Sequence, residues 1–214
     1  DQLVGLGYSY ITLKDEQDVI TNFKQQIEKH NKITLTEAEF KQILIYINKG
    51  NTFERAKTLR SRIPYVNDLG ENKTIQLLDS KHWCKNEFQV ANQISMKGNY
   101  DNRYDVTILI NGLPLVQIEL KRRGLELKEA FNQINRYQKH SYGAGFGLFQ
   151  FIQLFIISNG VNTKYYVNGR IKEREFKQTF YWTDKENELI TNLSEFADDF
   201  MNPCHLSKMI TQYI

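Results

Sequence analysis

The sequence predicts an α/β fold with a helical N-terminal region, and three observations support this prediction. Apolar residues recur at helical spacing through the first third of the chain. Two strands of alternating polarity, joined by Asn111-Gly112, follow in the middle. A helical pattern over 125–140 then separates this hairpin from the short apolar run 154–158. Strands, helix and strand in this order are typical of an α/β core.

Composition sets the class of protein. The chain has 214 residues, of which 41% are hydrophobic and 25% charged, so it can bury one good core and is not disordered. It has no apolar run of about eighteen residues and no signal sequence at its start, which predicts a cytoplasmic protein without a membrane partner. The net charge of +3 neither requires nor excludes nucleic acid.

The N-terminal third carries three helical patterns. Residues 15–31 place Ile20, Phe23 and Ile27 on one face, and Thr36 with Glu39 forms a capping box ahead of a second helix that stops at Gly50. A third helix is expected over 53–62, ended by Pro64.

The middle and the tail follow. Strands are expected over 74–78, 88–96, 104–110, 115–121, 154–158 and 164–167, with a loop over 97–102. Helices are expected over 125–140, over 184–200 and from Asn202, with Pro203 at the first helical position.

The two cysteines, Cys84 and Cys204, lie 120 positions apart. A secreted protein of this size usually has more cysteines, which favours a reducing compartment and two buried thiols. His82 and His205 lie beside these cysteines, but the pairs lack the spacers that are usual in zinc sites.

The alternation of side chains in the central hairpin identifies a candidate site. Asp105 on the first strand and Glu119 and Lys121 on the second fall on the face opposite the aliphatic residues. A three-residue loop over 111–113, or a bulge with the same effect, sets Asp105 directly opposite Glu119, whereas a simple two-residue loop sets it opposite Ile118.

Opposed carboxylates destabilise a sheet unless a cation or a proton lies between them. Carboxylate oxygens, together with the carbonyl of Leu120, suit Mg²⁺, with Mn²⁺ as a substitute. Lys121 is then well placed to orient water or to stabilise charge on a phosphate. The alternative is an ordinary hairpin with a charged outer face, and Leu109 and Leu115 on that face argue against it.

Asp105 followed by Glu119-Leu120-Lys121 resembles the PD-(D/E)xK nuclease signature, which is weak by itself. The surrounding segments are more specific and resemble the N-terminal nuclease domain of the restriction (R, HsdR) subunit of type I restriction-modification enzymes. The similarity is strong over about residues 79–160. Its segments are Asn86-Glu87-Phe88, Asn92-Gln93, Arg103-Tyr104-Asp105-Val106, Asn111-Gly112-Leu113-Pro114-Leu115, Ile118-Glu119-Leu120-Lys121, Ala130-Phe131-Asn132-Gln133 and Ser158-Asn159-Gly160.

The resemblance implies a PD-(D/E)xK restriction-endonuclease-like core, a mixed central sheet flanked by helices, over 71–183. A helical N-terminal region over 1–70 would pack on it, and a helical tail over 184–214 would lead to a motor domain that this chain lacks. Asp105, Glu119 and the Leu120 carbonyl would bind Mg²⁺, and Asp105, Glu119 and Lys121 would be the catalytic residues.

The family also carries a Q-x-x-x-Y element, which Gln133 and Tyr137 match on one face of the helix. They would position the DNA, unless they are simply a polar helix position and a half-buried tyrosine. The basic residues expected to track phosphates are Arg122, Arg123, Lys128 and Arg136, together with Lys139.

Two features depart from the family pattern. Tyr104 stands where a proline is usual, and a third acidic residue usually comes from an early helix, of which this chain would hold only a part. Glu28, Glu37 and Glu39 stay open as stand-ins.

The resemblance also implies partners: double-stranded DNA, the methyltransferase (M) and specificity (S) subunits, and motor domains that use ATP. Gly143, Gly145 and Gly147 are not followed by a phosphate-binding lysine, so no ATP site is expected within this chain. The leading hypothesis is a Mg²⁺-dependent endodeoxyribonuclease that cuts non-specifically after translocation. The alternatives are a DNA-clamping or motor-docking module, and a structure-specific nuclease similar to Holliday-junction resolvases.

Overall fold

The computed structural model describes residues 1–96, 102–140, 147–169 and 175–214. In this part of the chain six strands form a central sheet, in the order β1-β4-β5-β6-β7-β8. Neighbouring strands are parallel at β1/β4 and β6/β7 and antiparallel elsewhere, so the sheet is mixed. The strands are β1 (Ser9–Tyr10), β4 (Phe88–Met96), β5 (Asn102–Ile110), β6 (Leu113–Leu120), β7 (Leu154–Ser158) and β8 (Thr163–Val167).

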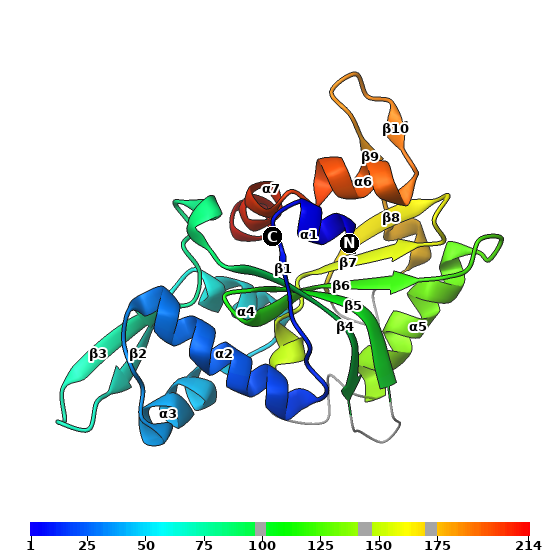
Figure 1. Cartoon of the computed structure of the whole chain (residues 1–214). Helices are drawn as coiled ribbons and strands as arrows, with labels where there is room; N and C mark the ends of the chain where they lie inside the picture. Colours follow the sequence, from blue (N-terminus) through cyan, green and yellow to red (C-terminus); the bar gives the residue numbers. More distant parts are fainter. Residues whose placement is uncertain (97–101, 141–146, 170–174) are drawn as a thin grey trace.

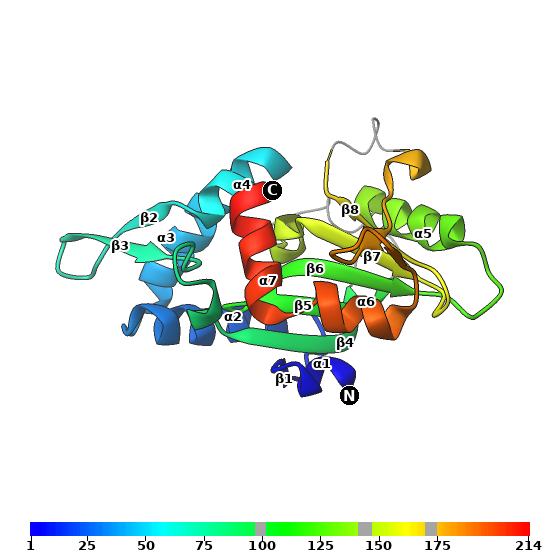
Figure 2. The same ribbon diagram turned by 90° about the horizontal axis from the view of Figure 1, so that it is seen from above.

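Helices cover both faces of this sheet, as neighbouring tyrosines on β8 show. The ring of Tyr165 lies 4.9 Å from that of Phe200 on α6 (Leu193–Phe200), while the ring of Tyr166 lies 5.2 Å from that of Phe131 on α5 (Leu127–His140). Helices α6 and α7 (Pro203–Lys208) lie on one side and α5 on the other (Figures 1 and 2). The predicted mixed α/β architecture is therefore confirmed.

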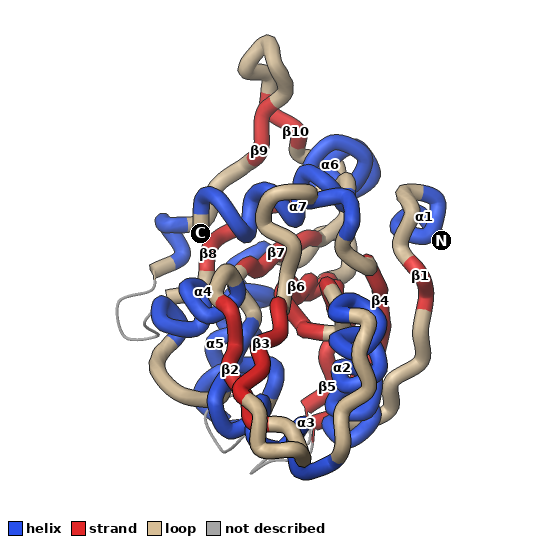
Figure 3. Tube along the Cα trace, turned by 90° about the vertical axis from the view of Figure 1, so that its left-hand side faces the viewer, coloured by secondary structure: helices blue, strands red, loops and turns tan. Residues whose placement is uncertain are grey.

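The N-terminal third contains the three predicted helices, α2 (Glu16–Asn31), α3 (Glu37–Ile47) and α4 (Thr52–Leu59). The predicted capping box is confirmed, because Glu39 N–H donates to the Thr36 hydroxyl and Thr36 N–H donates to the Glu39 carboxylate. These helices and the hairpin of β2 (Arg62–Val66) and β3 (Asn72–Gln76) form a group beside the strands β4–β6 (Figures 1 and 3). The short helix α1 (Gln2–Gly5) precedes β1.

The expectation that this region is helical throughout is wrong at two places. Ser9–Tyr10 joins the central sheet, and Arg62–Val66 forms strand β2, which pairs with β3 (Asn72–Gln76). Pro64 therefore lies within a strand and does not merely end a helix. A two-stranded ribbon tolerates this proline because each of its strands has a free edge.

The predicted helix over 184–200 begins later, at Leu193, where the Asn192 side chain caps α6. The residues before it form a hairpin of β9 (Trp182–Thr183) and β10 (Leu189–Ile190), which protrudes from the molecule (Figures 1 and 3). The Asp184 carboxylate accepts the backbone N–H groups of Glu186 and Glu188 and so stabilises a turn instead of a helix.

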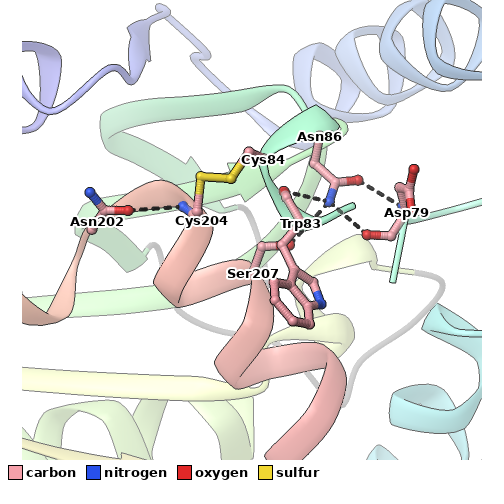
Figure 4. Close-up of a disulfide and its surroundings, with 7 residues drawn as sticks. All are labelled: Asp79, Trp83, Cys84, Asn86, Asn202, Cys204 and Ser207. Atoms are coloured by element: carbon pink, nitrogen blue, oxygen red, sulfur yellow. Dashed lines mark hydrogen bonds between the residues drawn. A yellow bond between two sulfur atoms is a disulfide. The ribbon is translucent and has the colours of Figure 1, made fainter. Parts of the chain in front are cut away.

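The prediction of two buried free thiols is also wrong. Cys84, in the short 3₁₀ helix Trp83–Lys85, forms a disulfide with Cys204 on α7, and neither cysteine is buried (Figure 4). The fold brings together two residues that are 120 positions apart, which sequence spacing gave no reason to expect. The described residues contain no helix that is long and apolar enough to cross a membrane.

Candidate active site at the end of the β5–β6 hairpin

The register of the β5–β6 hairpin shifts at a bulge. Ile110 pairs with Leu113 across a two-residue turn, so the three-residue loop does not form. The register then shifts between Ile108 and Leu109, and Val106 pairs with Ile118. This is the register expected from a bulge, although the paired residues end at Val106 and Ile118, one position before Asp105 and Glu119.

The β5–β6 turn is stabilised by its backbone conformation and by hydrogen bonds of the Asn111 side chain. Asn111 and Gly112 both have positive φ angles, 48° and 79°, as a tight hairpin turn requires. The buried Asn111 side chain accepts the Glu87 N–H and donates to the carbonyl of Leu77 and to the side-chain oxygen of Asn86. Asn86 in turn donates to the Ser207 hydroxyl on α7 (Figure 4). The hairpin is thereby tied to the C-terminal helix.

The polar face of the hairpin lies under α5 and is buried. Residues that pair across neighbouring strands point to the same face of a sheet. Gln117 pairs with Phe155, and Phe155 pairs with Tyr166, which contacts α5. Gln117 and Glu119, two residues apart on β6, therefore both face α5. Thr107 donates to Gln117 at 3.0 Å, and both residues are buried. The interpretation as an ordinary solvated face is therefore excluded.

Glu119 is completely buried, and its two carboxylate oxygens have different surroundings. Lys121 Nζ donates to Oε1 at 2.9 Å, whereas Oε2 has no hydrogen-bond partner among the described residues. The pKa of Glu119 is raised to about 7: burial is the main cause, the Lys121 bond opposes the rise, and the nearby Asp105 adds to it. Glu119 thus presents a buried acceptor atom that a proton or a cation would satisfy.

Asp105 is only half-buried and binds the main chain of the opposite strand. Its Oδ2 accepts the Leu120 N–H at 2.9 Å. Leu120 is the last residue of β6 and is partly exposed. Asp105, Glu119 and Leu120 therefore meet where the sheet reaches the surface.

Gln133 and Tyr137 on α5 join this group, as their spacing predicts. Lys121 Nζ donates to Gln133 Oε1, Gln133 Nε2 donates to the Tyr137 hydroxyl, and that hydroxyl donates to the Arg103 carbonyl at 3.3 Å. Burial is the main cause that raises the pKa of Tyr137. The chain of bonds fixes the Lys121 ammonium between Glu119 and α5.

The predicted basic residues, Arg122, Arg123, Lys128 and Arg136, are all exposed, in the segment after β6 and along α5. The side chain of Lys139 lies outside the described residues, as do the loop residues 97–101 and the glycines Gly143 and Gly145.

None of the three acidic stand-ins is bound to this group. Glu28 accepts the Leu35 N–H, Glu37 pairs with Lys24, and Glu39 caps α3 and accepts the Asp68 N–H. The described residues hold no group of three or more histidine, cysteine, aspartate or glutamate side chains that could bind a metal ion. Among the described residues the acidic part of the site is therefore a pair.

Sequence reasoning missed the buried asparagine pair, Asn86 and Asn111, that supports the hairpin from behind. The Asn-Gly turn signal draws attention to Asn111, because asparagine tolerates a positive φ angle. Nothing in the sequence indicates that its side chain reaches Asn86, 25 positions earlier.

The donor set fits a hard divalent cation. It combines an unpartnered buried carboxylate oxygen of Glu119 with the half-buried carboxylate of Asp105 and the neighbouring main chain of Leu120. Carboxylate oxygens, and a main-chain carbonyl such as that of Leu120, are ligands of the kind that Mg²⁺ and Mn²⁺ prefer. An ammonium group 2.9 Å from one of the carboxylates adds a positive charge that could face a phosphate.

Comparison with known proteins shows extensive similarity. Residues 1–174 match the sequence family described as "Type I restriction enzyme R protein N terminus". An endonuclease subunit of a type I restriction enzyme from Staphylococcus saprophyticus is 47% identical over 221 residues, which cover all of this chain and 23% of that protein. The EcoprrI endonuclease subunit from Escherichia coli is 38% identical over 218 residues, 99% of this chain and 70% of that protein.

A third relative is less similar. A putative type I restriction enzyme endonuclease subunit from Methanocaldococcus jannaschii is 31% identical over 183 residues, which cover 82% of this chain and 17% of that protein. The chain thus spans about a quarter of the length of its Staphylococcus saprophyticus relative.

Proposed function

The chain belongs to the family of N-terminal regions of type I restriction enzyme R proteins, and from this premise we propose that it is a Mg²⁺-dependent endodeoxyribonuclease domain with a PD-(D/E)xK core over 71–183. One observation carries the proposal. The buried Glu119 keeps an unpartnered oxygen beside Asp105, while Lys121 covers its other oxygen. Such an arrangement is unfavourable for a purely structural carboxylate and suits a ligand of a metal ion.

The roles of the residues follow from this geometry. Asp105, Glu119 and the Leu120 carbonyl would hold Mg²⁺, which when bound lowers the pKa of water and neutralises charge on a phosphodiester. Lys121, restrained by Glu119 and Gln133, would orient the attacking water and stabilise negative charge on the phosphate. Gln133 and Tyr137 would keep that lysine in place at the DNA backbone. Arg122, Arg123, Lys128 and Arg136 would bind phosphates.

The wider setting is part of the same proposal. The domain would cut double-stranded DNA non-specifically after ATP-driven translocation by motor domains of the complete subunit, in a cytoplasmic complex with M and S subunits. Thiols are ordinarily reduced in that compartment, so Cys84 and Cys204 would there be a dithiol unless an oxidant acts on them.

A DNA-clamping or motor-docking module is the second candidate. The observation that favours it is the closed chain of bonds from Glu119 through Lys121 to Gln133 and Tyr137, which satisfies most polar groups without any metal. A clamp would depend on the exposed arginines, and a nuclease would depend on Lys121 and the carboxylates.

The deciding experiment is Lys121→Ala in the complete subunit, assembled with its partner subunits and assayed for DNA cleavage and ATP-driven translocation. Cleavage should be lost while translocation continues. Lys73→Ala is the matched control, because it removes a lysine from an exposed pair with Glu71 and should leave both activities unchanged. Unchanged cleavage by Lys121→Ala would refute the proposal. A preference for branched over linear DNA would instead indicate a resolvase-like nuclease.

A further inference from the structure

Gln93 has a left-handed backbone inside a strand. Four described residues other than glycine have positive φ angles: Lys32, Gln93, Asn111 and Asn187. Lys32 ends α2, and Asn111 and Asn187 lie in the turns of the β5–β6 and β9–β10 hairpins. Gln93, at 55°, lies within the nine-residue strand β4. A side chain with a Cβ atom disfavours this conformation, which persists only where the surrounding structure imposes it.

The irregular residue lies directly opposite Asp105. Asn92 pairs with Val106 and Ile94 with Tyr104, but Gln93 and Asp105 between them are not paired in the ladder. On the other side of β5 the paired residues end at Val106 and Ile118. Asp105 is thus released from the ladder toward both neighbouring strands, and its carboxylate accepts the Leu120 N–H instead.

The alternation of side chains along β5 is disturbed at the same place. The ring of Tyr104 packs 5.1 Å from that of Tyr137 on α5. Asp105, the next residue, binds the end of β6 on the side where Lys121 reaches α5. Consecutive residues of a regular strand point to opposite faces, so β5 is rotated locally where β4 is kinked: Tyr104 leaves the face of Val106, while Asp105 keeps the face of Thr107 and Glu119.

We propose that Gln93 is a positioning residue: its left-handed backbone interrupts the β4–β5 ladder at Asp105, and the unpaired backbone allows the Asp105 carboxylate to shift along its face to the Leu120 N–H and the metal site. This inference rests on the proposed function, because it concerns a ligand of the proposed metal. It assigns the effect to the backbone of Gln93 and not to its amide group.

Substitutions that differ in backbone preference test this assignment. Gln93→Gly permits the left-handed conformation, Gln93→Ala disfavours it, and Gln93→Val favours a regular strand. Ser95→Val is the matched control, since Ser95 is another exposed position of β4 without a positive φ angle. Asp105→Asn provides the reference for a lost ligand.

The measurements are Mn²⁺ binding by calorimetry and hydrogen exchange of the Leu120 amide in the metal-free chain. Gln93→Val should weaken Mn²⁺ binding about ten-fold and accelerate the Leu120 exchange, as expected when a strained conformation that positions a ligand is lost. Gln93→Ala should change both in the same direction but less. Gln93→Gly and Ser95→Val should stay within about two-fold of the unaltered chain.

Three outcomes would overturn the inference. If Gln93→Val and Gln93→Ala both bind Mn²⁺ as the unaltered chain does, the kink does not position Asp105. If Gln93→Gly is as damaging as Gln93→Val, the amide group and not the backbone is responsible. If the unaltered chain shows no Mn²⁺ binding that depends on Asp105, the proposed function itself fails, and the inference fails with it.

Discussion

Glu119 is an acidic residue that is completely buried, and this burial makes the free energy of unfolding depend on pH. Its pKa is about 7 in the folded chain, against an ordinary value of 4.5. The folded chain therefore holds this proton more tightly than the unfolded chain does. The corresponding stability is present in full below about pH 4.5 and is lost as the pH rises through about 7.

We therefore expect Glu119→Gln to remove a fall in stability between these two pH values. In the unaltered chain this fall should be on the order of 3 kcal/mol, from the size of the pKa difference. Urea unfolding at a series of pH values, in the presence of a chelator, measures it. Glu186→Gln, which changes an exposed carboxylate, should leave the fall in place. An identical pH dependence in the Glu119→Gln variant would contradict the prediction.

The β5–β6 turn depends on a glycine for two separate reasons. Gly112 has a φ angle of 79°, and a Cβ atom there would lie 2.7 Å from the Cα of Phe23 on α2. Gly124 has a φ angle of 93° and no atom within 4 Å of such a Cβ. Comparing the two glycines separates the backbone conformation from the close approach of α2.

Gly124→Ala should cost about 1 kcal/mol in the free energy of unfolding, because it introduces left-handed strain alone. Gly112→Ala should cost at least about 1 kcal/mol more, because the turn and α2 must also move apart. Chemical denaturation of the two variants gives both values. Equal losses would show that α2 adapts freely to the added methyl group.

The disulfide attaches α7 to the segment that precedes β4, and the same helix is held by two other means. Ser207 accepts a hydrogen bond from Asn86, and Leu206 is buried in the core, as is Ile210 in the helical segment Met209–Tyr213 that continues α7. Reduction should therefore leave the helix content unchanged while lowering the free energy of unfolding by about 2–4 kcal/mol, as expected for a bond that closes a long loop.

Circular dichroism and denaturation with and without a phosphine reductant test this expectation. Cys84→Ser should reproduce the loss and abolish the response to the reductant. A response to reductant that persists in Cys84→Ser would have to arise from something other than this bond.

The elements that could be predicted are those fixed by local patterns. Period-two alternation identified the face that carries Asp105 and Glu119, and the spacing of four between Gln133 and Tyr137 identified their shared helix face. The Asn192 cap and the turn at Asp184 overrode the helical pattern over 184–200. The disulfide and the Asn86–Asn111 pair join residues distant in sequence, so local patterns contain no information about them.

Across the whole molecule the net charge is small, so the proposed DNA binding must depend on where the positive charges lie. The total is +3, and the residues expected at the DNA are exposed around the end of β6 and along α5. Lys49 and Lys57, at the end of α3 and on α4, are also exposed, but they belong to the N-terminal group of helices. Two double variants can thus lower the net charge equally at two different places.

The double variant Arg122→Gln/Arg123→Gln should weaken binding to duplex DNA and reduce the slope of log affinity against log salt by about 2, because each lost phosphate contact removes about 0.9. Lys49→Gln/Lys57→Gln should leave the slope nearly unchanged. Fluorescence anisotropy between roughly 50 and 200 mM salt measures both slopes. Equal reductions of the two salt slopes would mean that net charge alone drives the association. The surface beside Lys121 would then not be a specific binding site for the DNA backbone. A reduction confined to the arginine variant would place a phosphate within reach of the carboxylate pair, as hydrolysis at that site requires.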